Sequence, residues 1–197
     1  MRAVIQAVSS ASVRVNGGEP RAIGPGLMIL LGVRDTDSLD IVPKLADKCA
    51  GLRIFPDAEG KLNLSAKDLG YSALVVSQFT LYGDTKKGYR PSFIKAAKPP
   101  LSVDSYELFL AEMNKQGLKD VQHGEFGADM QVALVNEGPC TIIIDTDEWK
   151  KKERPPCRLF IFRALRRCIP IPSCSFPTQA MPWSLIRRQM RRPTIKF

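Results

Sequence analysis

Hydrophobic and polar side chains alternate along residues 2–15, a pattern that predicts a β-strand with one buried face. Asn16, Gly17 and Gly18 follow directly, and an Asn-Gly pair is typical of a tight hairpin turn. Residues 23–33 then form a continuous apolar run, as in a strand that is buried on both faces. The first part of the chain is therefore predicted to form a hairpin that leads into the interior of a sheet.

Two segments have apolar residues at the three- and four-residue spacing of an amphipathic helix. The first spans residues 39–49 and follows a capping residue at Asp37 or Ser38. The second follows Ser102, another favourable capping residue, and is expected to end near Gly117. The apolar stripes predict that one face of each helix is buried.

Shorter apolar runs bounded by turn-forming residues predict the remaining strands, over residues 52–55, 73–81, 121–126, 129–136 and 141–145. Residues 82–100 read as a loop rich in Gly, Pro and Lys. Gly138 and Pro139 fall between the last two runs, where a turn is expected. Strands and helices thus mix along one predicted domain of the α/β class, residues 1–149.

The periodic pattern stops after Lys150, and the balance of charge changes sign there. Residues 1–149 contain 16 Lys and Arg against 19 Asp and Glu, whereas residues 150–197 contain 13 Lys and Arg and one acidic residue, Glu153. We interpret residues 150–197 as a basic, disordered C-terminal extension. It is either a solvated appendage or an arm that binds polyanions without specificity.

The overall composition, with 44% hydrophobic and 25% charged residues, is that of a soluble globular protein. No apolar run approaches the roughly 18 residues of a membrane span, and the N-terminal segment lacks the apolar core of a secretory signal. The five cysteines are irregularly spaced and form no CxxC pair, which argues against a disulfide framework or a zinc site. We expect a cytoplasmic protein that does not bind membranes and needs no metal or cofactor.

Two segments carry the candidate chemistry: SQFTLYGDTKKGYRPSF at residues 77–93 and NEGPCT at residues 136–141. They supply hydroxyls, an amide, cations and backbone groups, but no histidine and no pair of carboxylates. The single histidine, His123, lies away from both segments and is assigned a structural or surface role. Such a site is suited to holding an RNA end and to acting through backbone dipoles.

Each candidate residue also has a structural interpretation. Ser77 and Thr80 are either ordinary hydroxyls at a strand end or ligands for a ribose hydroxyl or an ester carbonyl. A nucleophilic threonine would need a base, which the sequence does not offer. Lys86, Lys87 and Arg90 belong either to a solvated basic loop or to a phosphate-binding loop. The aromatic residues interleaved with these cations favour nucleotide binding.

Four motifs resemble the signatures of the D-aminoacyl-tRNA deacylase family: SQFTL at residues 77–81, KGYRPSF at 87–93, FGADMQV at 126–132 and NEGPCT at 136–141. Their order and spacing also agree with that family, and the opening strands are similar to it. The resemblance covers about residues 1–147 and does not extend to residues 150–197.

The resemblance implies a compact α/β subunit with a curved, barrel-like sheet and two main helices, which forms a homodimer with active sites at the subunit interface. It implies hydrolysis of the ester that joins a D-amino acid to the tRNA 3′ end, and also of glycyl-tRNA mischarged on alanine tRNA. A Gly138–cis-Pro139 pair from the partner subunit is expected to reject L-aminoacyl-tRNA. The reaction is expected to use a ribose hydroxyl of the RNA itself.

The resemblance also assigns roles to individual residues. The catalytic pocket is implied to be lined by Ser77, Gln78, Phe79 and Thr80, with the Phe79 N–H as an oxyanion donor. Selection of the substrate's chirality is assigned to Asn136, Gly138, Pro139 and Thr141. RNA binding is assigned to Lys87, Gly88, Arg90, Pro91 and Phe93, with Phe126 and Met130 packing on the terminal adenine.

One position departs from the family pattern. Relatives often carry an arginine after the glutamine of the first strand, where it helps to hold the Gly-Pro loop, whereas Gln6 is followed here by Ala7. Two alternatives therefore stay open. One is a nucleic-acid-binding protein that retains the fold and uses its basic extension. The other is a related editing deacylase with a trans Gly-Pro bond that acts on mischarged L-aminoacyl-tRNA.

Overall fold

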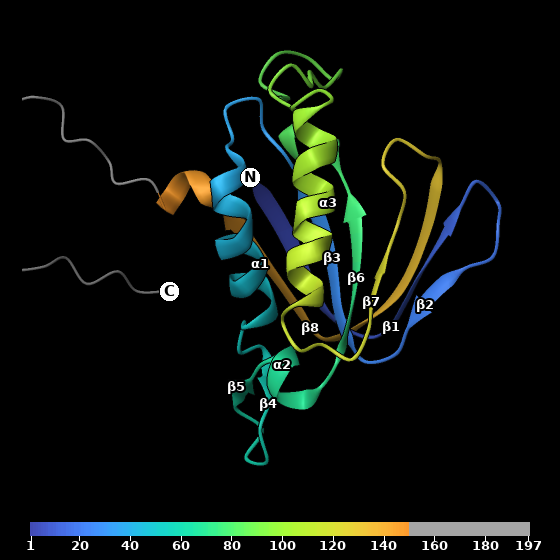
Figure 1. Cartoon of the computed structure of the whole chain (residues 1–197), viewed down its shortest axis with the longest axis vertical. Helices are drawn as coiled ribbons and strands as arrows, with labels where there is room; N and C mark the ends of the chain where they lie inside the picture. Colours follow the sequence, from blue (N-terminus) through green and yellow to red (C-terminus); the bar gives the residue numbers. More distant parts are fainter. Residues whose placement is uncertain (150–197) are drawn as a thin grey trace, which may run out of the picture. The chain divides into compact units, whose positions relative to one another are not determined.

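Residues 1–149 of the chain are described by a computed structural model (Figure 1). The basic extension predicted for residues 150–197 lies outside the described residues. Within residues 1–149, no helix is both long and apolar enough to cross a lipid bilayer.

A six-stranded sheet forms the centre of the fold, with the order β2-β1-β3-β6-β7 and with β8 also paired to β1. Its strands are β1 (Arg2–Val15), β2 (Arg21–Ile23), β3 (Gly26–Gly32), β6 (Ser72–Ser77), β7 (Val121–His123) and β8 (Met130–Asp145). β3, β6 and β7 run parallel, whereas β1 is antiparallel to all of its partners. The sheet is curved and nearly closed, so the predicted barrel-like α/β fold is confirmed (Figure 1).

Helical segments and a two-stranded ribbon complete the described part of the chain. They are η1 (Leu39–Ile41), α1 (Val42–Ala50), β4 (Phe55–Pro56), β5 (Leu62–Leu64), α2 (Ala66–Leu69), η2 (Phe79–Tyr82), α3 (Leu101–Asn114) and η3 (Thr146–Trp149). The two longest helices, α1 and α3, lie side by side over one face of the sheet (Figure 1). They are the two main helices that the sequence predicts.

β3 is buried on both faces, as its continuous apolar sequence predicts. Leu27, Ile29 and Leu31 belong to the main core, which they share with Phe109 of α3. Met28 belongs to a second, smaller core. Because successive side chains of a strand point to opposite faces, the two cores lie on opposite sides of β3. This double burial holds the centre of the sheet, and with it β6, in a fixed position.

The start of β3 lies so close to β6 that residue 26 has to be glycine. A Cβ atom on Gly26 would lie 2.0 Å from the carbonyl oxygen of Ser72. From this contact β6 runs alongside β3 in unbroken register, ending with Ser77 opposite Leu31. The pairing therefore determines the position of Ser77, the first candidate site residue, at the end of β6.

The strand predicted over residues 73–81 is shorter than expected. Gln78 still donates its N–H to the Leu31 carbonyl at 2.8 Å, but β3 ends at Gly32 and offers no further partners. Local hydrogen bonds then take over, and the Gly83 N–H bonds to the Thr80 carbonyl at 2.9 Å. The segment Phe79–Tyr82 is accordingly a 3-10 turn, η2, rather than the end of a strand.

The turn predicted at Gly138 and Pro139 is also wrong. Residues 130–145 form one long strand, β8, because the fourteen-residue β1 is long enough to pair with both halves. The register jumps between Gln6, opposite Thr141, and Val8, opposite Asn136. The Gly-Pro pair therefore lies in a large bulge within a strand.

Several boundaries differ from the sequence prediction for local reasons. α3 begins after Pro100, whose restricted φ suits a helix start, and Ser102 is buried inside the helix rather than capping it. The strand expected over residues 52–55 is reduced to the two-residue β4. The run 23–33 is divided between β2 and β3.

The short helix α2 was missed. Its signal is present in the sequence, because Ser65 and Asp68 form a capping box in which each side chain bonds to the other's backbone N–H.

Candidate active site

A pocket of about 300 Å³ opens where the end of β6 faces the turn that joins β7 to β8. Its walls are formed by Val76, Ser77, Gln78, Phe79, Phe126, Gly127, Ala128, Met130 and Val132. Five of these residues were assigned to the site from sequence, in two motifs almost fifty positions apart. The parallel pairing of β6 with β7 brings the two motifs together.

Tyr106 holds the far wall of the pocket. This buried α3 side chain places its hydroxyl 3.0 Å from the carbonyl oxygen of Val75 and 3.2 Å from that of Gly124. Its ring lies 6.2 Å from the ring of Phe126. Burial raises the pKa of Tyr106, so its hydroxyl stays a neutral donor. Tyr106 lies within the second helix predicted from the sequence, but no sequence signal indicated what its hydroxyl contacts.

Arg21 and Gly124 support the same turn. The Arg21 guanidinium donates to the His123 carbonyl at 2.8 Å and to the Glu125 carboxylate at 2.6 Å. A Cβ on Gly124 would lie 2.4 Å from the sulfur of Met130. Glycine is therefore needed for Met130 to pack beneath the turn. His123 lies in β7 and does not line the pocket, in agreement with the structural role assigned to it.

The near wall of the pocket offers hydrogen-bonding groups but none that titrates. The Gln78 amide donates a short hydrogen bond to the Thr80 hydroxyl oxygen. Thr80 itself is exposed and does not line the pocket. Phe79 begins η2, so its backbone N–H has no acceptor within the turn. Ser77, Gln78 and a free N–H can orient and polarise a carbonyl, but they cannot act as a general base at neutral pH.

Only part of the basic loop that follows η2 lies next to the pocket. The ring of Phe93 packs edge-to-face on the ring of Phe79, a pocket residue, with the centroids 5.2 Å apart. The other predicted RNA-binding residues of the loop are exposed and do not line the pocket: Lys87, Gly88, Arg90 and Pro91. Phe93 is thus brought next to the pocket, whereas these cations are not.

The four residues assigned to chirality lie on β8 and do not line this pocket. Asn136, Gly138, Pro139 and Thr141 are all exposed. The Gln6 amide lies 3.3 Å from the Thr141 hydroxyl and ties the bulge to β1. The position occupied by Ala7 is buried.

The expected cis bond between Gly138 and Pro139 is not found. Within residues 1–149 the cis peptide is Pro99–Pro100, and Gly138–Pro139 is trans. The trans form of an X-Pro bond is intrinsically favoured by about 0.5–1 kcal/mol. In the isolated chain both residues are exposed, so no packing contact is present that would reverse this preference.

Within residues 1–149, no group of three or more His, Cys, Asp or Glu side chains is arranged to hold a metal ion. The two cysteines among these residues, Cys49 and Cys140, are free thiols.

A model of the family described as D-Tyr-tRNA(Tyr) deacylase matches residues 4–145. The chain belongs to this family. It is 52% identical over 146 residues to the D-aminoacyl-tRNA deacylase of Akkermansia muciniphila, covering 74% of this chain and 97% of that protein. It is 53% identical over 159 residues to the protein of the same name from Chloroflexus aurantiacus, covering 81% and 99% of the two chains.

Two solved structures have a similar fold. The structure titled c-Myc DNA Unwinding Element Binding Protein has a TM-score of 0.69 and 38% identity, covering 74% of this chain and 98% of that one. A probable eukaryotic D-amino acid tRNA deacylase has a TM-score of 0.65 at 19% identity, which supports the fold alone. The family match contains every residue that the sequence assigned to the site, and it ends before residues 150–197.

Proposed function

We propose that the chain is a tRNA-editing esterase that hydrolyses D-aminoacyl-tRNA to free D-amino acid and tRNA. The observation that carries the proposal is the pocket at the end of β6, in which Ser77, Gln78 and Phe79 face Phe126 and Met130. Apolar and aromatic walls suit a terminal adenine, and hydroxyl, amide and backbone N–H groups suit the ester next to it.

The proposed chemistry uses backbone placement rather than a nucleophilic side chain. Water attacks the ester carbonyl, the Phe79 N–H stabilises the oxyanion, and the ester oxygen leaves with the ribose as a hydroxyl group. No side chain that lines the pocket titrates near neutral pH. A ribose hydroxyl of the substrate is therefore the proposed proton carrier.

We propose that a second copy of the chain completes the site. β8 pairs with β1 on one side only, and it exposes four large apolar residues: Val132, Leu134, Val135 and Ile143, which are 38%, 36%, 57% and 65% exposed. Exposed large apolar residues along a strand that is paired on one side only are typical of an interface. A homodimer through β8 would let Gly138 and Pro139, which do not line their own pocket, reach the pocket of the partner.

In this arrangement the backbone of Gly138 and Pro139 would contact the amino group of the substrate and leave no room for an L side chain. Glycine has no side chain and would therefore not be excluded by this contact, so glycyl-tRNA mischarged on alanine tRNA is a proposed second substrate. The products are free tRNA and the free amino acid, which is a D-amino acid for the first substrate and glycine for the second.

The test is to measure deacylation of D-Tyr-tRNA and L-Tyr-tRNA by the purified full-length chain. We expect rapid hydrolysis of the D form and none of the L form above the uncatalysed rate. Absence of hydrolysis, or equal rates for the two forms, would refute the proposal.

Two other functions are favoured by particular observations. The trans Gly138–Pro139 bond favours an editing enzyme for mischarged L-aminoacyl-tRNA, and faster hydrolysis of the L form in the same assay would support it. The neighbour titled c-Myc DNA Unwinding Element Binding Protein favours a DNA-binding protein. Tight DNA binding in a chain that hydrolyses neither substrate would support that function instead.

A further inference from the structure

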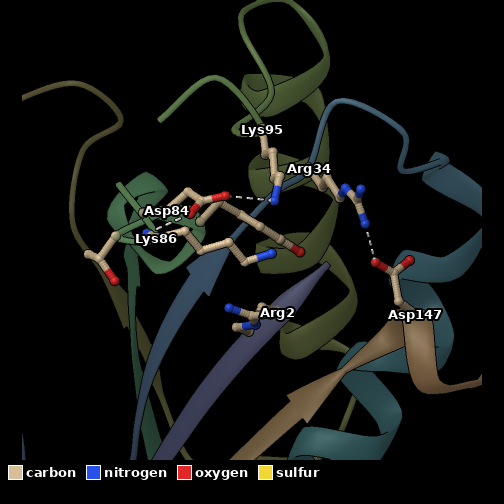
Figure 2. Close-up of a pocket in the computed structure, with 9 residues that line it drawn as sticks. Arg2, Arg34, Asp84, Lys86, Lys95 and Asp147 are labelled. Carbon is tan, nitrogen blue, oxygen red and sulfur yellow. Dashed lines mark hydrogen bonds and ion pairs between the residues drawn. The ribbon is translucent and has the colours of Figure 1, made fainter. Parts of the chain in front are cut away.

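A second pocket, of about 280 Å³, lies beside the candidate active site and is rich in cations. It is lined by Arg2 of β1, by Arg34 just beyond β3, and by Lys86 and Lys95 of the loop after η2. Figure 2 shows the amino groups of Lys86 and Lys95 and the guanidinium of Arg2 turned toward the same space. Residues far apart in the sequence therefore build one positively charged hollow.

The turn η2 separates this pocket from the candidate active site. Phe79, at the start of the turn, lines the active-site pocket, and Tyr82, at its end, lines the cationic one. A 3-10 helix rises about 2 Å per residue, so these two residues are roughly 6 Å apart along the turn. The second pocket is therefore within reach of a polynucleotide that ends in the first.

The charges of the pocket leave one cation without a counter-charge. Three cations are paired with carboxylates at 2.6–3.1 Å: Arg2 with Asp145, Arg34 with Asp147 and Lys95 with Asp84. The ammonium group of Lys86 forms no ion pair with any carboxylate of residues 1–149. Asp84 accepts a hydrogen bond from the backbone N–H of Lys86, and its ion pair is with Lys95. Because the Nε of Arg34 also lies 3.7 Å from the Asp35 carboxylate, the four cations are matched by four carboxylates, and Lys86 is the cation that none of them pairs.

One buried donor of the same pocket also lacks an acceptor. Within residues 1–149 the hydroxyl of Tyr82 has no hydrogen-bond partner, whereas the Nε of Arg34 forms no hydrogen bond but lies 3.7 Å from the Asp35 carboxylate. Burial raises the pKa of Tyr82, so its hydroxyl stays protonated and able to donate. A buried donor without a partner is rare and costly, and an oxygen-rich ligand would satisfy the Tyr82 hydroxyl.

Arg2 is already held in place for such a ligand. Its guanidinium bonds to Asp145 and donates to the Leu81 carbonyl at 2.8 Å, and it lies 5.1 Å from the centre of the Tyr82 ring. These contacts still leave N–H groups on its planar head. Little side-chain freedom would be lost when an anion binds.

We propose that this pocket binds one phosphodiester group of the RNA whose 3′ end occupies the candidate active site. The identity of the RNA rests on the proposed function, whereas the phosphate chemistry rests on the pocket alone. The unpaired ammonium of Lys86 matches the single charge of a phosphodiester, and the unpaired Tyr82 hydroxyl can donate to one of its free oxygens. A nucleoside polyphosphate would bring several negative charges against one.

The test compares the full-length chain with two charge-removing variants, Lys86→Gln and Lys119→Gln. Lys119 is the matched control, because it is exposed, forms no ion pair within residues 1–149 and precedes β7 beside Tyr71, at the opposite end of β6 from Ser77. Binding of uncharged tRNA is followed by fluorescence anisotropy over a series of salt concentrations.

We expect Lys86→Gln to raise the Kd for tRNA several-fold and to lower the slope of log Kd against log salt by about 0.7–0.9, the loss of one phosphate contact. Lys119→Gln should change neither quantity, and Lys86→Arg should restore both. Equal Kd values and slopes for Lys86→Gln and Lys119→Gln would overturn the proposal.

A second measurement distinguishes RNA from a free phosphate ion as the source of the ligand. Inorganic phosphate is titrated into the full-length chain in a calorimeter. Submillimolar phosphate binding that Lys86→Gln abolishes, with tRNA affinity unchanged, would assign the pocket to free phosphate and overturn the RNA assignment.

Because uncharged tRNA is used, the outcome does not depend on hydrolysis. A chain that fails to hydrolyse D-Tyr-tRNA but shows the Lys86 effect refutes the proposed function and supports the pocket. A chain that hydrolyses D-Tyr-tRNA but shows no Lys86 effect refutes only the proposal that this pocket binds a phosphodiester group.

Discussion

The hydroxyl of Tyr106 lies 3.0 Å from the carbonyl oxygen of Val75, deep beneath the candidate active site. This contact connects α3 to the end of β6, and a second contact to Gly124 connects it to the turn that carries Phe126. The two walls of the pocket are therefore held by one side chain. The other buried tyrosine, Tyr82, makes no such hydrogen bond within residues 1–149.

Tyr106 and Tyr82 allow a matched pair of substitutions that each remove one buried hydroxyl. We expect Tyr106→Phe to lower the free energy of unfolding by about 1 kcal/mol, because a buried hydrogen bond is lost. Tyr82→Phe should not lower this free energy and should raise it slightly, because its buried hydroxyl has no partner to lose. Urea unfolding of both variants in phosphate-free buffer provides the measurement, and equal losses would contradict the hydrogen-bond pattern.

Substitutions at Thr80 and Gly138 separate side-chain chemistry from backbone placement. We expect Thr80→Ala to keep deacylation of D-Tyr-tRNA within about tenfold of the original rate. This loss is smaller than the rate loss of about 10²–10³ that removal of an oxyanion donor typically causes. Gly138→Val should abolish activity, because it fills the space next to the substrate amino group.

A control is needed because Gly138 has a φ of +111°, where any side chain is strained. Gly60 has a φ of +77° on the β4–β5 turn, with no atom near its Cβ position. Gly60→Val should bring comparable backbone strain and leave deacylation unchanged. A folded Thr80→Ala protein without activity, or a trapped acyl-enzyme, would show that Thr80 is the nucleophile after all.

The exposed face of β8 predicts the oligomeric state. We expect the full-length chain to sediment as a dimer and Val135→Asp to sediment as a monomer, because a charge would be buried at the interface. Leu62→Asp is the control, since Leu62 is 62% exposed on β5. A monomeric parent chain would contradict the proposal that a second copy completes the site.

Thiol reactivity tests the packing of α1. Burial raises the pKa of Cys49 to about 12, so only about one thiol in ten thousand is ionised at pH 8. We expect Cys49 to resist iodoacetamide in the native protein and to react in urea, whereas the half-buried Cys140 should react under both conditions. Peptide mass spectrometry distinguishes the two sites, and rapid native labelling of Cys49 would contradict the packing of this helix.

The basic extension allows a comparison of affinity with turnover. We expect a chain that ends at Lys150 to retain turnover at saturating tRNA but to bind tRNA more weakly and with a smaller dependence on salt, because residues 150–197 carry 13 Lys and Arg and one acidic residue. Unchanged affinity and salt slope would show that the extension does not bind RNA. A truncated chain that does not fold would place the domain boundary elsewhere.

The sequence alone determined the elements that depend on neighbouring residues. The alternation over residues 2–15, the Asn16-Gly17 turn, the doubly buried strand and the helix after Ser38 all follow from local periodicity and turn chemistry, and all are confirmed. The motifs at residues 77–81 and 126–132 both supply residues that line one pocket, but the sequence linked them only through the family resemblance.

Only the tertiary structure decided features that depend on distant partners. β6 ends at Ser77 because β3 ends, and the Gly138–Pro139 bulge lies within one strand because β1 is long enough to pair with both halves of it. The same holds for the hydroxyl of Tyr106 and for the cationic pocket, whose four cations come from three separate segments. A local pattern carries no information about which residues far along the chain will supply a hydrogen bond, a strand partner or a counter-charge.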